Sequence, residues 1–381
     1  MSESELQRPT WTEINLDNLA FNLKSVKNFV GKNYKYMAVV KADAYGHGAI
    51  ECAKLLEGEG VDWFGVALPE EGIALRKAGI RKLILCLGGF WNGQEKYLLN
   101  YNLTPVISQI EKARIYNSLA RERGTIANIH IKVDTGMGRI GVRHDEFADF
   151  AGKLTELTNL RVEGLMTHFA AADNLSENDF TNEQIRRFYA ALNILKEKGF
   201  SPVYNDLANS PGAVAHEKGR GNMVRLGGVL YGLGGDVLPK EINKPELKPV
   251  MSLYSRITNL KTVPKGESLG YSRTFVTERN SLIATIPIGY QDGYTRKLSN
   301  CGQVIVKGVF VPVVGRISMD WTIIDVTDVP GVQLDDKVIL IGEQSGTKVS
   351  AEDLAAKTGT ISYEITCGID RRVRRIYVDS R

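Results

Sequence analysis

Short apolar runs that alternate with longer helical segments constrain the fold of this chain more than any other feature of its sequence. Eight such runs lie between residues 12 and 245. Several are almost wholly apolar, which is typical of strands buried on both faces of a parallel sheet. The eight predicted strands are Met37–Ala42, Asp62–Ala67, Lys82–Gly88, Thr104–Ile107, Asn128–Asp134, Arg161–Phe169, Pro202–Asn209 and Met223–Tyr231. Eight strand–helix units in about 235 residues, with helices such as Asn182–Gly199 between strands, predict a (β/α)8 barrel.

The chain changes character after Pro249. β-branched runs broken by Gly, Pro or Asp-Asp turns replace the helical spacing, which returns only around Ala351–Thr358. The predicted strands here are Leu253–Val263, Ser281–Ile288, Gln303–Val306, Val311–Val314, Trp321–Val326 and Lys337–Ile341. We therefore expect two domains, a barrel over residues 12–245 and a mainly β domain over residues 246–381.

Composition excludes several classes of function. The 381 residues carry 48 Lys and Arg against 44 Asp and Glu, and this net charge of +4 is too small for a dedicated nucleic-acid binder. The four cysteines lie far apart, so neither a disulfide scaffold nor a metal site is predicted. No apolar run approaches the roughly 18 residues of a membrane span, and the amino terminus has no apolar signal segment. We expect a cytoplasmic protein that binds neither membranes nor nucleic acid.

A lysine at the end of the first predicted barrel strand is the most informative polar outlier. Lys41 follows the apolar residues MAVV and precedes a turn of small residues that contains Tyr45. Such a lysine either extends out of the barrel mouth into solvent or acts as a nucleophilic amine whose pKa is lowered by its site. Barrel active sites lie at the carboxyl ends of the strands, which favours the second interpretation. The residues by themselves leave both open.

Further polar residues stand in or after the later strands. Lys132 lies within an apolar strand, so it needs a partner or a modification that removes its charge, and Arg139 follows in a position suited to a carboxylate or phenolate. A lone histidine such as His168 is more often a core residue than a catalyst. The remaining outliers, suited to capping, hydrogen bonding or anion binding, are Asn209, Ser210, Arg225, Gly227 and Gly228. Their recurrence at successive strands predicts a single site.

Eight motifs, in order, resemble those of the alanine racemase family. They are AVVKADAYGHG, DTGMGRIG, MTHF, ANS, MVRLGGVLYGL, LGYSRTF, IPIGYQDGY and GRISMDW, and they span nearly the whole chain. The resemblance implies a (β/α)8 TIM barrel followed by a mainly β domain that the N-terminal segment 1–11 joins. It also implies the cofactor pyridoxal 5′-phosphate (PLP) and a head-to-tail homodimer whose active sites are shared across the interface.

The same resemblance implies roles for individual residues. Lys41 matches the lysine that binds the cofactor covalently and serves as one base, and Tyr271 matches a second base supplied by the partner subunit. Arg225 matches the residue that faces the pyridine nitrogen, and His168 the link between that arginine and the tyrosine. The other matches are Tyr45, Ser210, Gly228 and Tyr363 for the phosphate, Arg139 for the cofactor phenolate and the substrate carboxylate, Lys132 for a position that is often carbamylated, and Met319 for the substrate pocket.

The resemblance therefore implies an isomerase that interconverts L- and D-alanine by a two-base mechanism and supplies D-alanine for peptidoglycan. A serine or broad-specificity racemase is one alternative, which Tyr363 and Met319 disfavour because they imply a small pocket. A fold-related PLP decarboxylase has an acidic residue where Arg225 stands, and a non-catalytic PLP-binding barrel protein lacks the β domain. The sequence departs from the family pattern at two positions. Ser318 stands in place of a cysteine, which we expect to be tolerated, and Arg374 stands in place of a proline, which affects the local geometry of the terminal strand and not the chemistry.

Overall fold

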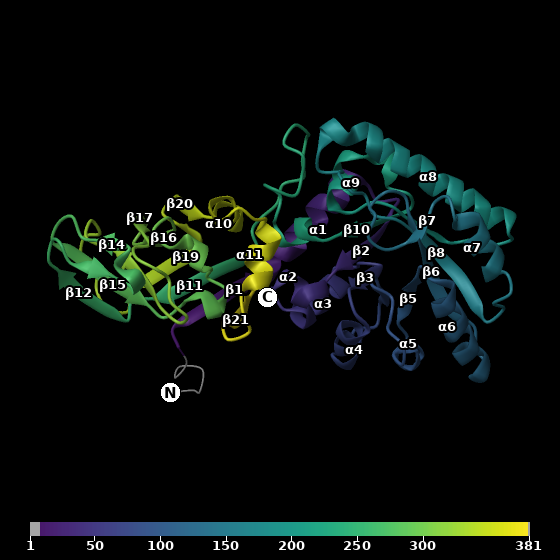
Figure 1. The fold of residues 1–381 in the computed structure, drawn as a ribbon, viewed down its shortest axis with the longest axis horizontal. Helices are drawn as coiled ribbons and strands as arrows, with labels where there is room; N and C mark the ends of the chain where they lie inside the picture. Colours follow the sequence, from purple (N-terminus) through teal and green to yellow (C-terminus); the bar gives the residue numbers. More distant parts are fainter. Residues whose placement is uncertain (1–7, 380–381) are drawn as a thin grey trace. The chain divides into compact units, whose positions relative to one another are not determined.

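The computed structural model describes residues 8–379, which fall into two compact units (Figure 1). One unit, the barrel unit, comprises Leu19–Ala44 and Ala49–Lys248. The other, the β unit, comprises the chain up to Asn18, the short piece Tyr45–Gly48 and the chain from Pro249 onward. The predicted limits 12–245, 246–381 and 1–11 differ from this division by several residues and stay a prediction. Their outermost parts, residues 1–7 and 380–381, lie outside the described residues.

The eight predicted barrel strands are present, and all of them pair in parallel. They are β2 (Lys35–Val39), β3 (Trp63–Val66), β4 (Leu83–Cys86), β5 (Thr104–Ile107), β6 (Ala127–Asp134), β8 (Leu160–Met166), β9 (Tyr204–Asp206) and β10 (Met223–Leu226). Because β5 pairs with β6 as well as with β4, the sheet closes into a barrel. A two-residue strand, β7 (Val142–Arg143), pairs with the end of β6.

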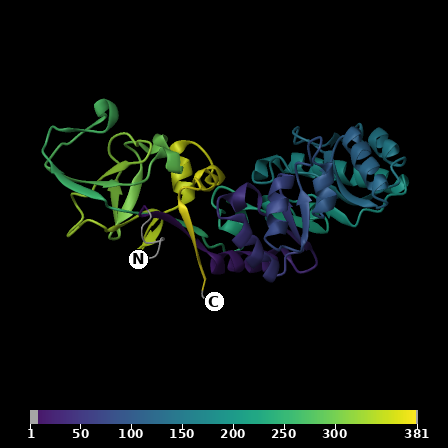
Figure 2. The same ribbon diagram turned by 90° about the horizontal axis from the view of Figure 1, so that it is seen from below.

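Helices cover the outside of this barrel, as Figures 1 and 2 show. They are α1 (Leu16–Val30), α3 (Ala49–Gly58), α4 (Pro69–Lys77), α5 (Glu95–Asn100), α6 (Ile110–Glu122), α7 (Phe147–Leu154), α8 (Asn178–Glu197) and α9 (Ser210–Ala215). The helix predicted at Asn182–Gly199 is confirmed as α8, and it begins earlier, at Asn178. Its apolar residues at spacings of three and four, including Ile185, Phe188 and Leu192, are buried, which explains why the helix lies flat on the barrel.

The barrel interior is filled in layers. One apolar layer takes a residue from each of six strands: Met37, Trp63, Leu85, Val106, Met166 and Met223. In each strand the side chain two positions further along faces the same side. The layers nearer the carboxyl ends of β6 and β10 therefore contain Lys132 and Arg225, both of which are buried.

The β unit is built around a seven-stranded sheet, in which the amino-terminal strand β1 pairs antiparallel with β11 and parallel with β21. The strands of this sheet are β1 (Thr10–Asn15), β11 (Met251–Arg256), β16 (Gln303–Val306), β17 (Val309–Pro312), β19 (Lys337–Gln344), β20 (Thr347–Val349) and β21 (Arg374–Val378). Two smaller sheets contain β12 (Asn259–Val263), β15 (Ser281–Ile286) and β18 (Thr322–Asp325), and β13 (Ser268–Leu269) with β14 (Phe275–Val276). The helices are α10 (Ala351–Thr358) and α11 (Ser362–Gly368).

One strand prediction in this unit is wrong. The run Leu253–Val263 was expected to be continuous, but it forms β11 and β12, which belong to different sheets. The break lies where the backbone changes partners: the N–H of Ile257 donates to the carbonyl of Asp336, and the N–H of Thr258 donates to the carbonyl of Thr285. An apolar pattern carries no information about such a change of partner, so the sequence could not reveal it.

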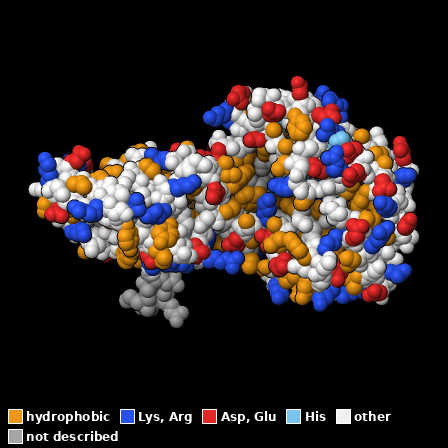
Figure 3. All heavy atoms as spheres, viewed as in Figure 1, with side chains coloured by type: hydrophobic (Ala, Val, Ile, Leu, Met, Phe, Trp, Pro, Cys, Tyr) orange, Lys and Arg blue, Asp and Glu red, His pale blue; other side chains and the backbone are white. Residues whose placement is uncertain are grey.

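The surface and the helices agree with the balanced composition. On the face drawn in Figure 3, acidic and basic side chains are interspersed and no large area carries one sign of charge. Within residues 8–379, every helix falls short of the length or the apolar character that crossing a bilayer requires.

Candidate functional site

Lys41 begins a left-handed turn at the carboxyl end of β2. The strand ends at Val39, so Lys41 lies beyond the strand and not within the predicted run Met37–Ala42. The turn, labelled α2 (Lys41–Tyr45), places Ala42, Asp43 and Ala44 at φ values of 50°, 53° and 55°, and Tyr45 at 55°. Left-handed backbone costs L-residues about 1–2 kcal/mol each, so this turn is held by its surroundings and not by local preference.

Two carboxylates hold the turn. Glu71 Oε1 accepts a hydrogen bond of 2.7 Å from the N–H of Ala42, and its Oε2 accepts from the N–H groups of Ala67 and Leu68 at the start of α4. Asp43 Oδ1 accepts from the N–H of Ala49 at the start of α3. The direction of the Lys41 side chain therefore depends on contacts made by distant segments.

Arg225 is the centre of a buried polar cluster in the barrel. Its Nη2 donates to the carbonyls of Thr167 (3.0 Å) and Leu207 (3.2 Å) and lies 3.2 Å from His168 Nδ1. Its Nη1 donates to the carboxylate of Asp206, with which Arg225 forms an ion pair. The side chain of Arg225 is 3% exposed and that of Asp206 is fully buried. All hydrogen bonds of the guanidinium to the described residues pass through Nη1 and Nη2, so Nε–H is its remaining donor.

The contact with Arg225 fixes the tautomer of His168. Arginine is only a donor, so Nδ1 of His168 must accept and the proton must sit on Nε2. Burial, and next to it the charge of Arg225, lowers the pKa of His168 to about 2. His168 is therefore a neutral imidazole near neutral pH, with its Nε2–H available as a donor.

Four cations share this end of the barrel. Burial, together with the charges of Arg225, Arg139 and Lys41 and against the opposing charge of Asp206, lowers the pKa of Lys132 to about 8. The same four cations lie close enough to His168 to shift its pKa. The structure thus brings together Lys41, Lys132, Arg139, His168 and Arg225, as the sequence predicted. A lysine with a pKa near 8 has a substantial neutral fraction near neutral pH, which carbamylation requires.

The predicted anion-binding residues of the barrel also lie together. Asn209 caps α9 by accepting from the N–H of Gly212 (3.1 Å). The buried Ser210 Oγ accepts from the N–H of Gly227 (2.9 Å), so its own hydrogen remains available to donate. Gly228 begins a short 3₁₀ turn directly after Gly227. These groups form a set of donors suited to a phosphate.

In the β unit, Tyr45 and Tyr363 lie side by side. Their ring centroids are 5.3 Å apart, with Tyr363 in α11. Gly46, directly after Tyr45, has φ +83°, and a Cβ atom there would lie 2.1 Å from the carbonyl oxygen of Thr366. Only glycine permits this close approach, which holds the piece Tyr45–Gly48 against α11 within the β unit.

Tyr271 and Met319 lie on neighbouring exposed loops of the β unit. Tyr271 is 69% exposed and Met319 is 51% exposed. The close approach of Gly270 to Arg316 shows that the two loops are adjacent. A Cβ atom on Gly270 would lie 3.1 Å from the backbone N of Arg316, which belongs to the GRISMD motif. The loop of Met319 is fixed by the N–H of Tyr290, which donates to the carbonyl of Ser318 (3.0 Å).

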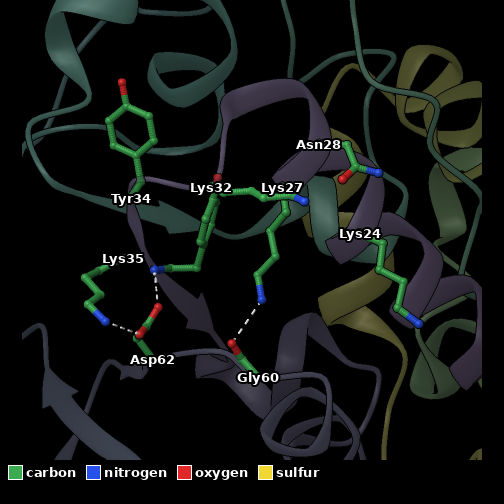
Figure 4. A pocket seen from close by; sticks show the side chains of 9 residues that line it. Lys24, Lys27, Asn28, Lys32, Tyr34, Lys35, Gly60 and Asp62 are labelled. Atoms are coloured by element: carbon green, nitrogen blue, oxygen red, sulfur yellow. Dashed lines mark hydrogen bonds and ion pairs between the residues drawn. The ribbon is translucent and has the colours of Figure 1, made fainter.

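A basic pocket elsewhere on the barrel unit is a weaker candidate (Figure 4). It has a volume of about 560 Å³ and lies near the amino end of β2. Three of the four lysines that line it are engaged: Lys27 donates to the carbonyl of Gly60, Lys35 pairs with Asp62, and Lys24 pairs with Glu59. Ion pairs therefore offset the charge of two of its lysines, and the pocket lies at the end of the barrel away from Arg225.

Two functional residues were missed by the sequence reasoning. Glu71 is one glutamate among several in an ordinary amphipathic helix, so nothing in the sequence sets it apart. Asp206 did carry a signal, because it is a carboxylate placed between an apolar strand and a helix cap. The sequence does not show what this carboxylate contacts, and only the geometry shows that it pairs with Arg225.

Models of the two alanine racemase domains match the chain in order. The N-terminal domain model covers residues 14–234 and the C-terminal domain model covers residues 250–377. This chain belongs to the alanine racemase family. Curated alanine racemases of Halothermothrix orenii and Geobacter sulfurreducens are 46% and 44% identical to it, over 98% of this chain in each case and 97% and 98% of theirs. The chain is therefore an isomerase with the activity of the alanine racemase family.

Solved structures agree with this assignment. The alanine racemase of Clostridium difficile 630 superimposes with a TM-score of 0.92 at 39% identity, over 98% of this chain and 96% of that one. The alanine racemase of Bartonella henselae with covalently bound pyridoxal phosphate gives a TM-score of 0.87 at 29% identity, over 97% and 99% of the two chains. The predicted fold, a (β/α)8 barrel with a mainly β domain, is confirmed.

Proposed function

We propose that this member of the family interconverts L- and D-alanine with PLP bound to Lys41, acts as a homodimer in the cytoplasm, and supplies D-alanine for peptidoglycan. The observation that carries the proposal is the buried cluster around Arg225 in a chain that matches both family domains. When bound, PLP supplies an electron sink that lets the α-proton of an amino acid leave.

The donors of the barrel fit this cofactor. Arg225 retains one donor, Nε–H, and an arginine cannot give up its proton, so a pyridine nitrogen facing it would remain an unprotonated acceptor. Ser210 and the backbone of Gly228 offer donors for a phosphate, and we assign Asn209 and Gly227 to the same cradle. By the resemblance to the family, we assign Tyr45 and Tyr363, whose rings are neighbours in the β unit, to phosphate binding as well.

Racemisation requires a base on each side of the α-carbon, because the proton leaves one face and returns to the other. We assign these roles to the Lys41 amine and to a Tyr271 hydroxyl from the partner subunit. His168 holds its proton on Nε2, from which it can donate to the tyrosine oxygen and stabilise its ionised form. Arg139 would bind the substrate carboxylate through its planar fork.

The exposure of the β-unit loops supports the homodimer. Tyr271, Met319, Trp321 and Tyr290 are large side chains that are 69%, 51%, 48% and 41% exposed. Exposed apolar side chains grouped on neighbouring loops are typical of a protein–protein contact. Coverage by a second copy would bury them and would bring a second base and Met319 to a substrate pocket.

Incubation of the purified protein with single L-amino acids in deuterated water tests the function. We expect L-alanine to gain deuterium at the α-carbon and to yield D-alanine, with L-serine converted more slowly. Exchange without D-alanine would overturn the assignment, and equal rates for serine would favour the broad-specificity alternative. In a parallel test, Lys41→Ala should remove the visible absorbance of the lysine-bound cofactor; colour that survives would show that Lys41 is misassigned.

A further inference from the structure

Asp206 is a buried carboxylate that the two-base scheme leaves without a role. It ends β9 and is fully buried. Its Oδ1 accepts from Nη1 of Arg225, and its backbone carbonyl lies 3.3 Å from the same nitrogen. Its Oδ2 is buried and has no hydrogen-bond partner among residues 8–379. Burial raises the pKa of Asp206 to about 6 against the opposing effect of Arg225, so the carboxylate is held at a cost in stability.

The strand register places Asp206 one layer deeper in the barrel than Arg225. The Cα atom of Asp206 is paired with Met166 on β8 and with Met223 on β10. Met223 precedes Arg225 by two positions and so faces the same side of the sheet. The carboxylate therefore contacts the guanidinium from the interior, on the side away from the carboxyl ends of the strands.

Asp206 also balances the charge of the cluster. Among the charged groups that shift the pKa of Lys132, Arg225, Arg139 and Lys41 are cations, and Asp206 is the carboxylate. The other acceptors of the guanidinium are neutral: the carbonyls of Thr167 and Leu207, and the imidazole of His168. A buried guanidinium without a counter-charge is strongly disfavoured.

We propose that Asp206 is the positioning residue for Arg225: it holds Nη1 from below, so that Nε–H points toward the ring nitrogen of a bound pyridine cofactor. The donors of arginine have a fixed planar geometry, and a fork anchored at Nη1 and Nη2 cannot turn. Because the carboxylate of Asp206 offsets the charge of Arg225, the ring nitrogen would face an ion pair with almost no net charge and not an isolated cation. The inference rests on the proposed function, since the cofactor enters only there.

The variant Asp206→Asn tests the proposal, because it keeps the shape and one acceptor but removes the charge. Two quantities are measured: the dissociation constant of PLP from the cofactor-free protein, and the ¹⁵N chemical shift of the ring nitrogen with labelled PLP. We expect the dissociation constant to rise about 10-fold and the ¹⁵N signal to move toward that of free pyridine. If both quantities equal those of the wild type, the proposal is overturned.

Glu163→Gln is the matched control. Glu163 is a half-buried carboxylate on the neighbouring strand β8, and its contact is with His130 and not with Arg225. We expect this variant to keep the wild-type dissociation constant and ¹⁵N signal. If Glu163→Gln changes both quantities as Asp206→Asn does, the changes come from a general loss of packing in the barrel, and the proposal fails. In an Arg225→Leu background, Asp206→Asn should add nothing further; an added effect would show that Asp206 acts by another route.

The proposal can fail separately from the proposed function. If the wild-type protein binds no PLP and does not exchange the α-proton of alanine, the proposed function is wrong. Crystal structures of the cofactor-free wild type and of cofactor-free Asp206→Asn then still test the positioning role. A guanidinium of Arg225 that has turned in the variant supports it, and one that is unmoved overturns it.

Discussion

Two histidines of the barrel, the partly buried His168 and the fully buried His130, show how position along a strand decides which contacts a side chain makes. His168 follows β8 and lies against Arg225, which fixes its tautomer. His130 lies within β6, with its ring centroid 5.2 Å from that of Trp63 and 5.8 Å from that of Tyr204. Neither nitrogen of His130 has a hydrogen-bond partner among the described residues.

The two rings differ in their surroundings as well as in their burial. Glu163 Oε2 lies 3.9 Å from His130 Nε2, a distance that would suit an ion pair. However, burial raises the pKa of Glu163 and lowers that of His130 to about 3, so both shifts oppose an ion pair. His168 has a directed partner and a free donor, whereas His130 is enclosed by aromatic rings. The same side chain is therefore equipped for proton chemistry in one layer and for packing in the next.

The largest effect is expected from His168→Gln. Losing the Nε2–H donor should lower the racemisation rate by about 10²-fold, while the visible absorbance of the bound cofactor is retained. Steady-state rates in both directions, together with the absorbance spectrum, check this. A rate close to that of the wild type would mean that His168, like His130, serves only in packing, and the two histidines would then not differ in function.

A smaller effect is expected from the charge of Lys132. If its neutral amine is carbamylated, removing dissolved CO₂ should lower wild-type activity by about 10-fold or less, and adding bicarbonate should restore it. Lys132→Met should show no response to CO₂ at all. Intact-protein mass spectrometry under native conditions detects the added CO₂ directly. If the activity of the wild type is as insensitive to CO₂ as that of Lys132→Met, the amine of Lys132 acts unmodified.

The smallest effect on activity is expected from His130→Phe. This variant should instead change how the free energy of unfolding depends on pH. His130, with its pKa of about 3, stays neutral in the folded state, whereas the unfolded chain takes up a proton near pH 6.5. Stability is therefore lost as the pH falls from about 6.5 toward 3, by up to about 1.4 kcal/mol per pH unit.

Because His130→Phe removes this proton uptake, its unfolding free energy should fall less steeply over that range, with racemisation unchanged. Urea denaturation at several pH values measures the two slopes. Parallel slopes for the two proteins would show that His130 is already protonated or is exposed in the folded state. Since the pKa of His168 is also lowered, the slope should shrink and not vanish.

The barrel could be predicted from the sequence because strands buried on both faces leave a distinct apolar pattern, such as Leu83–Cys86. The β unit was harder. The pairing of β1 with both β11 and β21 joins residues more than 200 positions apart, and no local pattern encodes it. The change of partners at Ile257 was missed for the same reason.

The candidate site divides in a similar way. Lys41, Arg139, His168 and Arg225 stood out because each interrupts an apolar or glycine-rich segment, and the resemblance to the alanine racemase family gave them roles. Asp206 could not be assigned without coordinates, because its role depends on which nitrogen of Arg225 it contacts. The tautomer of His168 likewise follows only from that geometry.

The left-handed turn after β2 bears on the order in which the chain folds. Four successive residues run against the preference of L-amino acids, so this segment cannot nucleate on its own. One end is held by Glu71 at the start of α4, and the other by the close approach of Gly46 to the backbone of α11, more than 300 residues later. The backbone geometry of Lys41 is therefore reached only after segments distant in the sequence have packed, so this turn forms late in folding and does not serve as a nucleus.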